Sequence, residues 1–130
     1  MRKIFKLTTV FFTAIFLASC TGVGNSSIGY KQITMAEAVK IMEEENGYII
    51  LDVRRPDEYA EGHIPGAINV ANESIGTNEI PELPDKSQLI LVYCRSGKRS
   101  KEASEKLVKL GYTNIIEFGG ILDWTGEIEK

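Results

Sequence analysis

Residues 89–100, LILVYCRSGKRS, join a fully apolar run to a short basic segment. The apolar run at 89–93 is typical of a strand that is buried on both faces of a sheet. From about residue 100 to 110, apolar side chains recur at helical spacing, and Gly111 suits the end of a helix. This stretch therefore predicts a strand, a loop of about six residues that begins at Cys94, and a helix.

The chain around this stretch continues the alternation of strands and helices. Residues 34–37, TMAE, predict a capping box at the start of a helix, and Gly47 is expected to end that helix. Further strands are expected at 48–53, 67–70 and 114–118, and short helical turns at 55–60 and after 120. Strands that alternate with helices predict the α/β class, with a parallel sheet covered by helices on both sides.

The loop that begins at Cys94 carries the residues that indicate chemistry. Ligand sites of parallel sheets collect at the carboxyl ends of the strands. A short loop at that position can curl so that its backbone N–H groups face the Cys94 sulfur, and Gly97 supplies the freedom for the turn. Three basic side chains add positive charge: Arg95, Lys98 and Arg99. This setting favours a thiolate, so Cys94 is predicted to be a nucleophile that needs no separate base.

Composition excludes several classes of protein. The 130 residues are 43% apolar and 25% charged, which is ordinary for a globular protein. The formal net charge of −3 argues against a general nucleic-acid binder. Two cysteines and one histidine are too few for a structural zinc site of the Cys₄ or Cys₂His₂ type, and neither a metal nor a cofactor is expected.

The first twenty residues have the anatomy of a secretion signal. Basic residues precede Leu7, a charge-free run continues to Ser19, and Cys20 follows. The run is shorter than the roughly 20 residues of a membrane-spanning helix, but it suits the apolar region of a signal peptide. Residues 17–20, LASC, resemble the lipobox of bacterial lipoprotein precursors, which implies cleavage and lipidation at Cys20. The alternatives are an ordinary cleaved signal peptide and an uncleaved short anchor.

These observations predict three segments. Residues 1–19 form a lipoprotein signal peptide, 20–29 a flexible tether rich in Gly and Ser, and 30–130 one folded domain. Loss of the three basic residues in the signal peptide changes the net charge from −3 to −6. The mature protein is expected in the bacterial cell envelope, outside the cytoplasm, held on a membrane by acyl chains on Cys20.

Four motifs together resemble the rhodanese-like sulfurtransferase family. The loop at 94–100, CRSGKRS, is similar to the active-site loop of that family, and residues 62–67, GHIPGA, to its upstream signature. Residues 51–54, LDVR, and 119–124, GGILDW, resemble further segments in the same order. The resemblance covers about residues 33–124, and it implies a single three-layer domain with a mostly parallel sheet of about five strands.

The resemblance implies transfer of sulfane sulfur. Cys94 would take a sulfur atom from thiosulfate, polysulfide or a persulfide, hold it as a persulfide, and pass it to a thiol or to cyanide. The substrate-binding residues would be those of the loop: Arg95, Ser96, Gly97, Lys98 and Arg99. Ser100 is expected to cap the following helix. The partners would be a small sulfur-containing donor and a thiol acceptor.

Two residues outside the loop bear on this hypothesis. His63 is the only histidine, but its place in the GHIPGA segment indicates a structural role in a turn. Glu58 stands where two-domain thiosulfate sulfurtransferases often carry an Arg. An acid that faced the pocket would weaken the binding of thiosulfate. Arg54, Arg55 and Glu58 are expected to form structural ion pairs.

Three other functions compete with sulfur transfer. Tyrosine and dual-specificity phosphatases carry a Cys-x₅-Arg loop, but the sixth residue after Cys94 is Ser100, so phosphatase activity is disfavoured. A non-enzymatic module could use the loop to hold an anion or a partner. A thiol redox protein is the third alternative, although Cys94 has no second cysteine for an internal disulfide once Cys20 is lipidated.

Overall fold

Five parallel strands form one sheet in the order β1-β5-β4-β2-β3. The strands are Lys31–Gln32 (β1), Ile49–Asp52 (β2), Ile68–Asn69 (β3), Ile90–Cys94 (β4) and Ile115–Gly120 (β5). The computed structural model describes residues 29–130, so the predicted signal peptide and Cys20 lie outside the described residues. The predicted α/β class with a parallel sheet of about five strands is confirmed.

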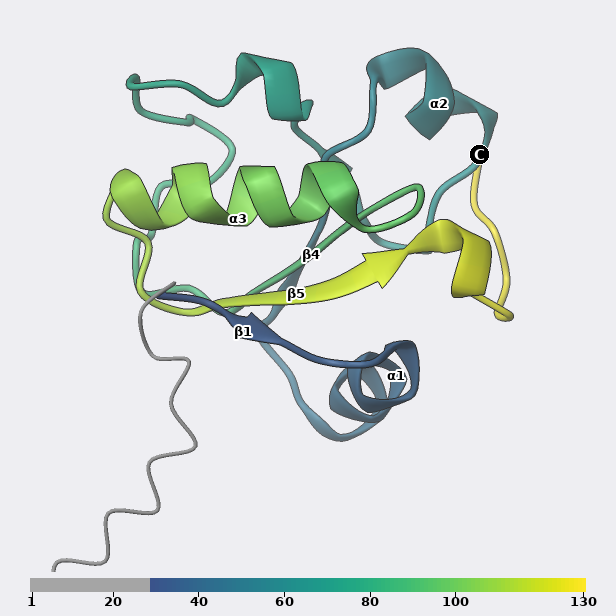
Figure 1. Ribbon diagram of the computed structural model, residues 1–130. Helices are drawn as coiled ribbons and strands as arrows, with labels where there is room; N and C mark the ends of the chain where they lie inside the picture. Colours follow the sequence, from purple (N-terminus) through teal and green to yellow (C-terminus); the bar gives the residue numbers. More distant parts are fainter. Residues whose placement is uncertain (1–28) are drawn as a thin grey trace, which may run out of the picture.

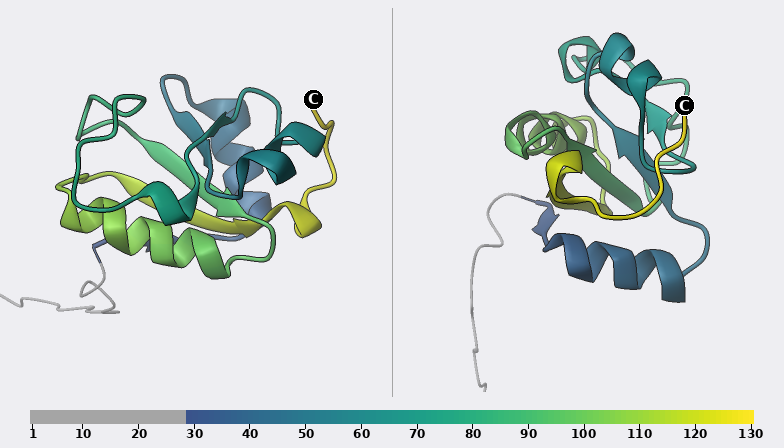
Figure 2. Two further views of the ribbon diagram at one scale, coloured as in Figure 1. Left: turned by 90° about the horizontal axis from the view of Figure 1, so that it is seen from above. Right: turned by 90° about the vertical axis from the view of Figure 1, so that its right-hand side faces the viewer.

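Helices cover both faces of the sheet. Met35–Glu44 (α1) lies on one face and Lys98–Lys109 (α3) on the other (Figure 1), and the end-on view in Figure 2 shows the same three layers. Three shorter helical segments complete the fold: Pro56–Glu61 (α2) and the 3₁₀ turns Asn72–Ser74 (η1) and Ile121–Asp123 (η2). No helix within residues 29–130 has the length and apolar character needed to cross a bilayer.

The alternation of side chains along β4 creates two cores. Val92 and Cys94 belong to the core under α3, whereas Leu91 and Tyr93 belong to the core under α1. All of these side chains are at most 1% exposed. Since successive side chains of a strand point to opposite faces, an uninterrupted apolar run is the pattern that a two-sided core requires.

Helix α1 begins where the sequence predicts and ends earlier. Its capping box is confirmed, because the N–H of Glu37 donates to Oγ1 of Thr34 (3.2 Å) and the N–H of Thr34 donates to Glu37 (2.7 Å). The expectation that Gly47 ends the helix is wrong. The backbone is already extended at Glu45, so the helix stops at Glu44 and Gly47 lies in the following turn.

A buried ion pair at the end of β2 accepts a hydrogen bond from the strand that carries Cys94. Oδ2 of Asp52 lies 2.7 Å from Nη2 of Arg54 and accepts a 2.7 Å hydrogen bond from the hydroxyl of Tyr93. Burial, together with the Asp52 charge, raises the pKa of the Tyr93 hydroxyl far above its usual value. Removing one partner of such a buried pair costs about 3–5 kcal/mol. The structural ion pair expected for Arg54 is therefore present.

The GHIPGA turn is held by the C-terminal segment, which runs beside α2 (Figures 1 and 2). His63 exchanges two backbone hydrogen bonds of 2.9 Å with Glu129. The His63 ring stacks on Tyr59 at 3.8 Å, and its Nδ1 lies 2.9 Å from the Tyr59 carbonyl oxygen. The hydroxyl of Tyr93 accepts a hydrogen bond from the N–H of Ile64. These contacts give His63 the structural setting that the sequence predicts.

Candidate active site

Cys94 is the last residue of β4, and its side chain is 1% exposed. The N–H of Gly97 donates a hydrogen bond of 3.0 Å to the Cys94 sulfur. An N–H donor and the positive end of a helix both stabilise negative charge on sulfur. The sulfur thus lies in a setting that suits a thiolate, as the loop pattern predicts.

The loop after Cys94 is shorter than expected, because α3 begins at Lys98 instead of near Ser100. Gly97 is the N-cap of α3 and has a φ of +108°. Side chains rarely tolerate that conformation, whereas glycine adopts it freely. Only Arg95, Ser96 and Gly97 therefore lie between β4 and α3. The first turn of α3 consequently packs beside the Cys94 sulfur.

Ser100 does not cap the helix as predicted. It is the third residue of α3, and its side chain points inward, with 0% exposure. Its Oγ lies 3.5 Å from the Cys94 sulfur and donates a 2.6 Å hydrogen bond to Oε1 of Glu117. Gly97 takes the capping position because the backbone turns there, three residues earlier.

Glu117 is a residue of the site that was not predicted from the sequence; it is 2% exposed and lies in the middle of β5. Ile115 and Glu117 stand two residues apart and so share the sheet face that α3 covers. An acid at an inward position of an apolar strand was the signal that could have identified it. Oε1 of Glu117 also accepts a 2.8 Å hydrogen bond from the N–H of Gly119.

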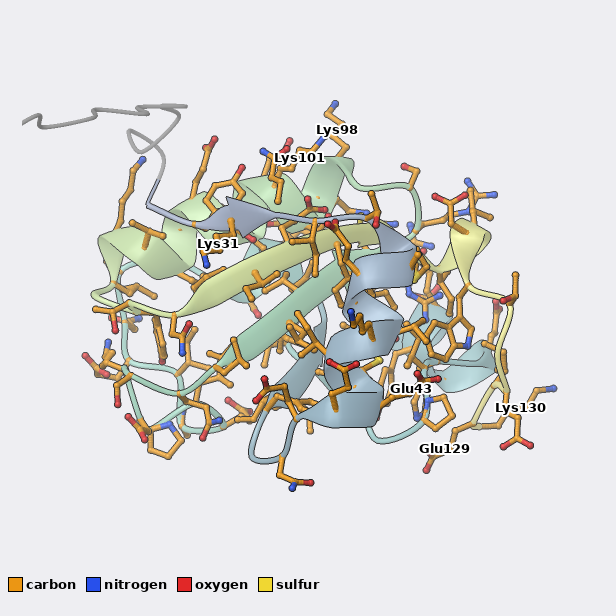
Figure 3. The ribbon with its side chains drawn as sticks, turned by 90° about the horizontal axis from the view of Figure 1, so that it is seen from below. Lys31, Glu43, Lys98, Lys101, Glu129 and Lys130 are labelled. Atoms are coloured by element: carbon orange, nitrogen blue, oxygen red, sulfur yellow. The ribbon has the colours of Figure 1, made fainter. Side chains whose placement is uncertain are left out.

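An open pocket of about 670 Å³ lies against the loop. Its lining is mostly charged: Arg54, Arg55, Glu58, Glu61, Glu73, Arg95, Arg99, Ile121 and Leu122. Arg95 and Arg99 are the two predicted loop cations that line it. Lys98 does not, and Figure 3 shows its side chain projecting outward from the start of α3, near Lys101.

Glu58 lines the pocket and forms an ion pair with Arg99. Its two carboxylate oxygens lie 2.6 and 3.0 Å from the guanidinium nitrogens of Arg99. The hydrogen bonds from Arg99 lower the pKa of Glu58, so the pair is formed at neutral pH and weakens only when the pH falls through that lowered value. Glu58 therefore offsets part of the positive charge beside the loop.

The arrangement fits a nucleophile that holds an anion. Cys94 receives an N–H donor from its own loop, the helix α3 starts four residues later, and arginines line the pocket beside the loop. Backbone donors placed in this way stabilise charge that develops on sulfur during a reaction. Residues 29–130 contain no group of three or more His, Cys, Asp or Glu side chains arranged to hold a metal ion.

Comparison with known proteins agrees with the fold and the motifs. The thiosulfate sulfurtransferase PspE of Escherichia coli is 37% identical over 73 residues, which cover 56% of this chain and 70% of PspE. The thiosulfate sulfurtransferase GlpE of Coxiella burnetii is 33% identical over 96 residues, or 73% of this chain and 87% of GlpE. Among solved structures, an E. coli rhodanese with anions superimposes with a TM-score of 0.58 at 34% identity, covering 64% of this chain and 98% of the other.

The model of one protein family, the rhodanese-like domain, matches residues 34–127. The match spans β2 to β5, the GHIPGA turn and the loop after Cys94. The four motifs, the parallel sheet and this match all lead to the same assignment. The chain belongs to the family of rhodanese-like domains.

Proposed function

We propose that this protein transfers sulfane sulfur through a persulfide on Cys94. The observation that carries the proposal is the 3.0 Å hydrogen bond from the N–H of Gly97 to the buried Cys94 sulfur. The neighbouring residues Arg95 and Arg99 line an open pocket. Relatives named thiosulfate sulfurtransferases support it. The solved E. coli rhodanese with anions, which is 34% identical, also supports an anionic ligand for this chain.

The transfer takes two half-reactions. The Cys94 thiolate attacks the outer sulfur of thiosulfate, the S–S bond of the donor breaks, and sulfite leaves with the electron pair. With a persulfide or polysulfide donor, a thiolate or shorter polysulfide leaves instead. An acceptor thiolate, or cyanide, then attacks the outer sulfur of the Cys94 persulfide, and Cys94 leaves as a thiolate. Such covalent catalysis predicts ping-pong kinetics.

Mass spectrometry tests the proposal directly. Incubation of the full chain with thiosulfate or polysulfide should add the mass of one sulfur atom to the peptide that contains Cys94, and cyanide should remove it as thiocyanate. Prior alkylation of Cys94 should prevent the gain. If no sulfane donor loads Cys94, the domain is a binding module or a redox protein, and the enzyme proposal fails.

We also propose that Glu58 sets which donor is used. Its carboxylate pairs with Arg99 and leaves Arg95 as the loop cation that lines the pocket without a hydrogen bond or ion pair to another side chain among residues 29–130. Thiosulfate carries two negative charges, so it loses more from a partly neutralised pocket than a donor of low charge does. This favours an organic persulfide, which carries at most one negative charge on its sulfur, over thiosulfate as the donor.

Replacing Glu58 by Gln should raise kcat/KM for thiosulfate about tenfold, because the field of a charged cleft changes association with an anion by that order or more. For an organic persulfide, which carries less negative charge than thiosulfate, the increase should be smaller, below about threefold. The matched control is Asp57→Asn, which removes the same charge from an exposed side chain that pairs with Arg55. An equal effect of both variants, or none in Glu58→Gln, would refute this role of Glu58.

The cellular site of this chemistry is a further proposal, and it rests on residues 1–20 of the sequence. Cleavage and lipidation at Cys20 would hold the domain on a membrane outside the cytoplasm. In bacteria that process lipoproteins, mass spectrometry should find the wild-type protein cleaved before residue 20 and acylated on Cys20, whereas the Cys20→Ser variant should carry no acyl chain. A wild-type protein without an acyl chain on Cys20 would contradict the proposal.

A further inference from the structure

Three buried side chains form a hydrogen-bonded chain behind the active-site loop. The Cys94 sulfur lies 3.5 Å from Oγ of Ser100, which lies 2.6 Å from Oε1 of Glu117. The three residues are 1%, 0% and 2% exposed. The sulfur transfer described above assigns the reacting atom to Cys94 and gives no role to Glu117, the ionisable side chain at the other end of these hydrogen bonds.

The contacts define a direction for protons. The thiol of Cys94 donates to Oγ of Ser100, and the hydroxyl of Ser100 donates to the Glu117 carboxylate. The hydroxyl also lies 2.9 Å from the carbonyl oxygen of Gly97, but the carboxylate is closer and charged, which makes it the stronger acceptor. An unbroken path therefore runs from the sulfur to a buried carboxylate.

Formation of a thiolate at Cys94 would add a second negative charge close to Glu117. A thiolate at Cys94 beside an ionised Glu117 would place two negative charges on one buried chain, and like charges disfavour that state. Two other titratable groups interact with these side chains. The pKa of Arg99 is raised mainly by its hydrogen bonds to Glu58 and to a smaller extent by Cys94, and the pKa of Tyr30 is raised mainly by burial and to a smaller extent by Glu117. Arg99 is already paired with Glu58, and Tyr30 is a weak acid whose pKa burial raises further.

We propose that Glu117 accepts the proton of Cys94 through Ser100 when the nucleophile forms. The S–H bond of Cys94 breaks as its proton passes to Oγ of Ser100, while the hydroxyl proton of Ser100 passes to the carboxylate of Glu117. The chain keeps one negative charge, which moves from Glu117 to the sulfur. After an acceptor has removed the outer sulfur, the two protons move back and restore the thiol.

This inference rests on the proposed function and deepens it, because it supplies the thiolate that attacks the donor. It also replaces the expectation that Cys94 needs no separate base, since Ser100 and Glu117 are joined to the sulfur only in the folded structure. Glu117 does not contact the reacting sulfur, so it acts through Ser100 as a positioning residue. The proposed proton transfer also gives a role to the Ser100 side chain, which points inward from the first turn of α3. The structure joins these residues from the end of β4, the first turn of α3 and the middle of β5.

The test is the pH dependence of Cys94 alkylation by iodoacetamide, measured on the full chain by peptide mass spectrometry to separate Cys94 from Cys20. In Glu117→Gln, the amide oxygen still accepts from Ser100 but takes no proton. The Cys94 thiol can then lose its proton only to solvent. The alkylation rate at pH 7 should fall at least about tenfold, and its rise with pH should move to higher pH.

Two variants complete the experiment. Ser100→Ala interrupts the path and should behave like Glu117→Gln. Ser104→Ala removes another buried hydroxyl of α3, one that donates to the Ser100 carbonyl oxygen, and should leave the profile unchanged. Circular dichroism establishes that each variant is folded.

A rate at pH 7 that stays equal or rises in Glu117→Gln would overturn the proposal. That result is expected if Glu117 is only a negative neighbour, since its removal would then favour the thiolate. The outcome is independent of sulfur transfer, because alkylation needs no sulfane donor. If wild type takes up sulfur but the pH dependence of Cys94 alkylation is unchanged in Glu117→Gln, the proton transfer to Glu117 is refuted and the proposed function is not.

Discussion

Replacing Cys94 by Ser should abolish sulfur uptake and reduce turnover of any sulfane donor at least about a thousandfold. A serine hydroxyl is not ionised near neutral pH and does not form the persulfide, whereas the hydrogen bond from Gly97 and the charges of the pocket would remain. The expected result is a folded protein that binds anions without turning over the donor. The measurement is thiocyanate formation, together with the mass of the peptide that contains residue 94.

The second cysteine provides a matched control for this prediction. Cys20→Ser removes a sulfur atom from the tether that the sequence predicts at residues 20–29, so it should retain sulfur transfer in detergent solution. Comparable turnover in Cys94→Ser and wild type would show that the activity comes from another group. Loss of activity in both variants would indicate that the lipid anchor, and not only the loop, is needed.

Replacing Gly120 by Ala should disrupt the loop and destabilise the whole domain. A Cβ at this position would lie 2.0 Å from the carbonyl oxygen of Arg95 and 2.5 Å from the backbone nitrogen of Ser96. Backbone atoms cannot escape by changing a rotamer, so the end of β5 or the loop must move. Overpacking of this kind costs about 3 kcal/mol, at the upper end of the usual range.

Displacement of the loop in Gly120→Ala should also reduce sulfur uptake by Cys94. Moving Arg95 and Ser96 shifts the N–H of Gly97 away from the Cys94 sulfur, so sulfur uptake should fall with stability. Denaturant unfolding measures the first effect and mass spectrometry the second. Gly76→Ala is the control, because no neighbouring atom lies within 4 Å of a Cβ there and the expected change is within about 0.5 kcal/mol. Similar stability of both variants would contradict the clash.

Local patterns in the sequence determined much of the fold. Strand β4 was predicted because burial on both faces leaves no position for a polar side chain, and the capping box of α1 because its hydrogen bonds span only three residues. Strand β1 was not predicted, because its two residues carry no such local pattern. Lys31 and Gln32 are exposed and polar, so only their backbone pairing with β5 makes them a strand.

The active site divides in the same way between local and distant contacts. Cys94, Gly97 and the basic residues of the loop were identified from the sequence, since a glycine and three cations after a buried strand suffice to indicate an anion site. The partners of those residues were not. Glu58 lies 41 residues from Arg99, and Glu117 lies 17 residues from Ser100, so no local pattern joins them.

Residue order alone identifies a buried strand that ends at Cys94 and a basic loop after it in an α/β domain. It also predicts a signal peptide at residues 1–19, which stays a prediction. Tertiary structure decided which charges face that loop. The parallel register sets Val92 beside Glu117 and Cys94 beside Gly120, and α2 brings Glu58 to Arg99. The physical reason is that the nucleophile and its loop are adjacent in the chain, whereas the groups that tune them meet only when the sheet forms.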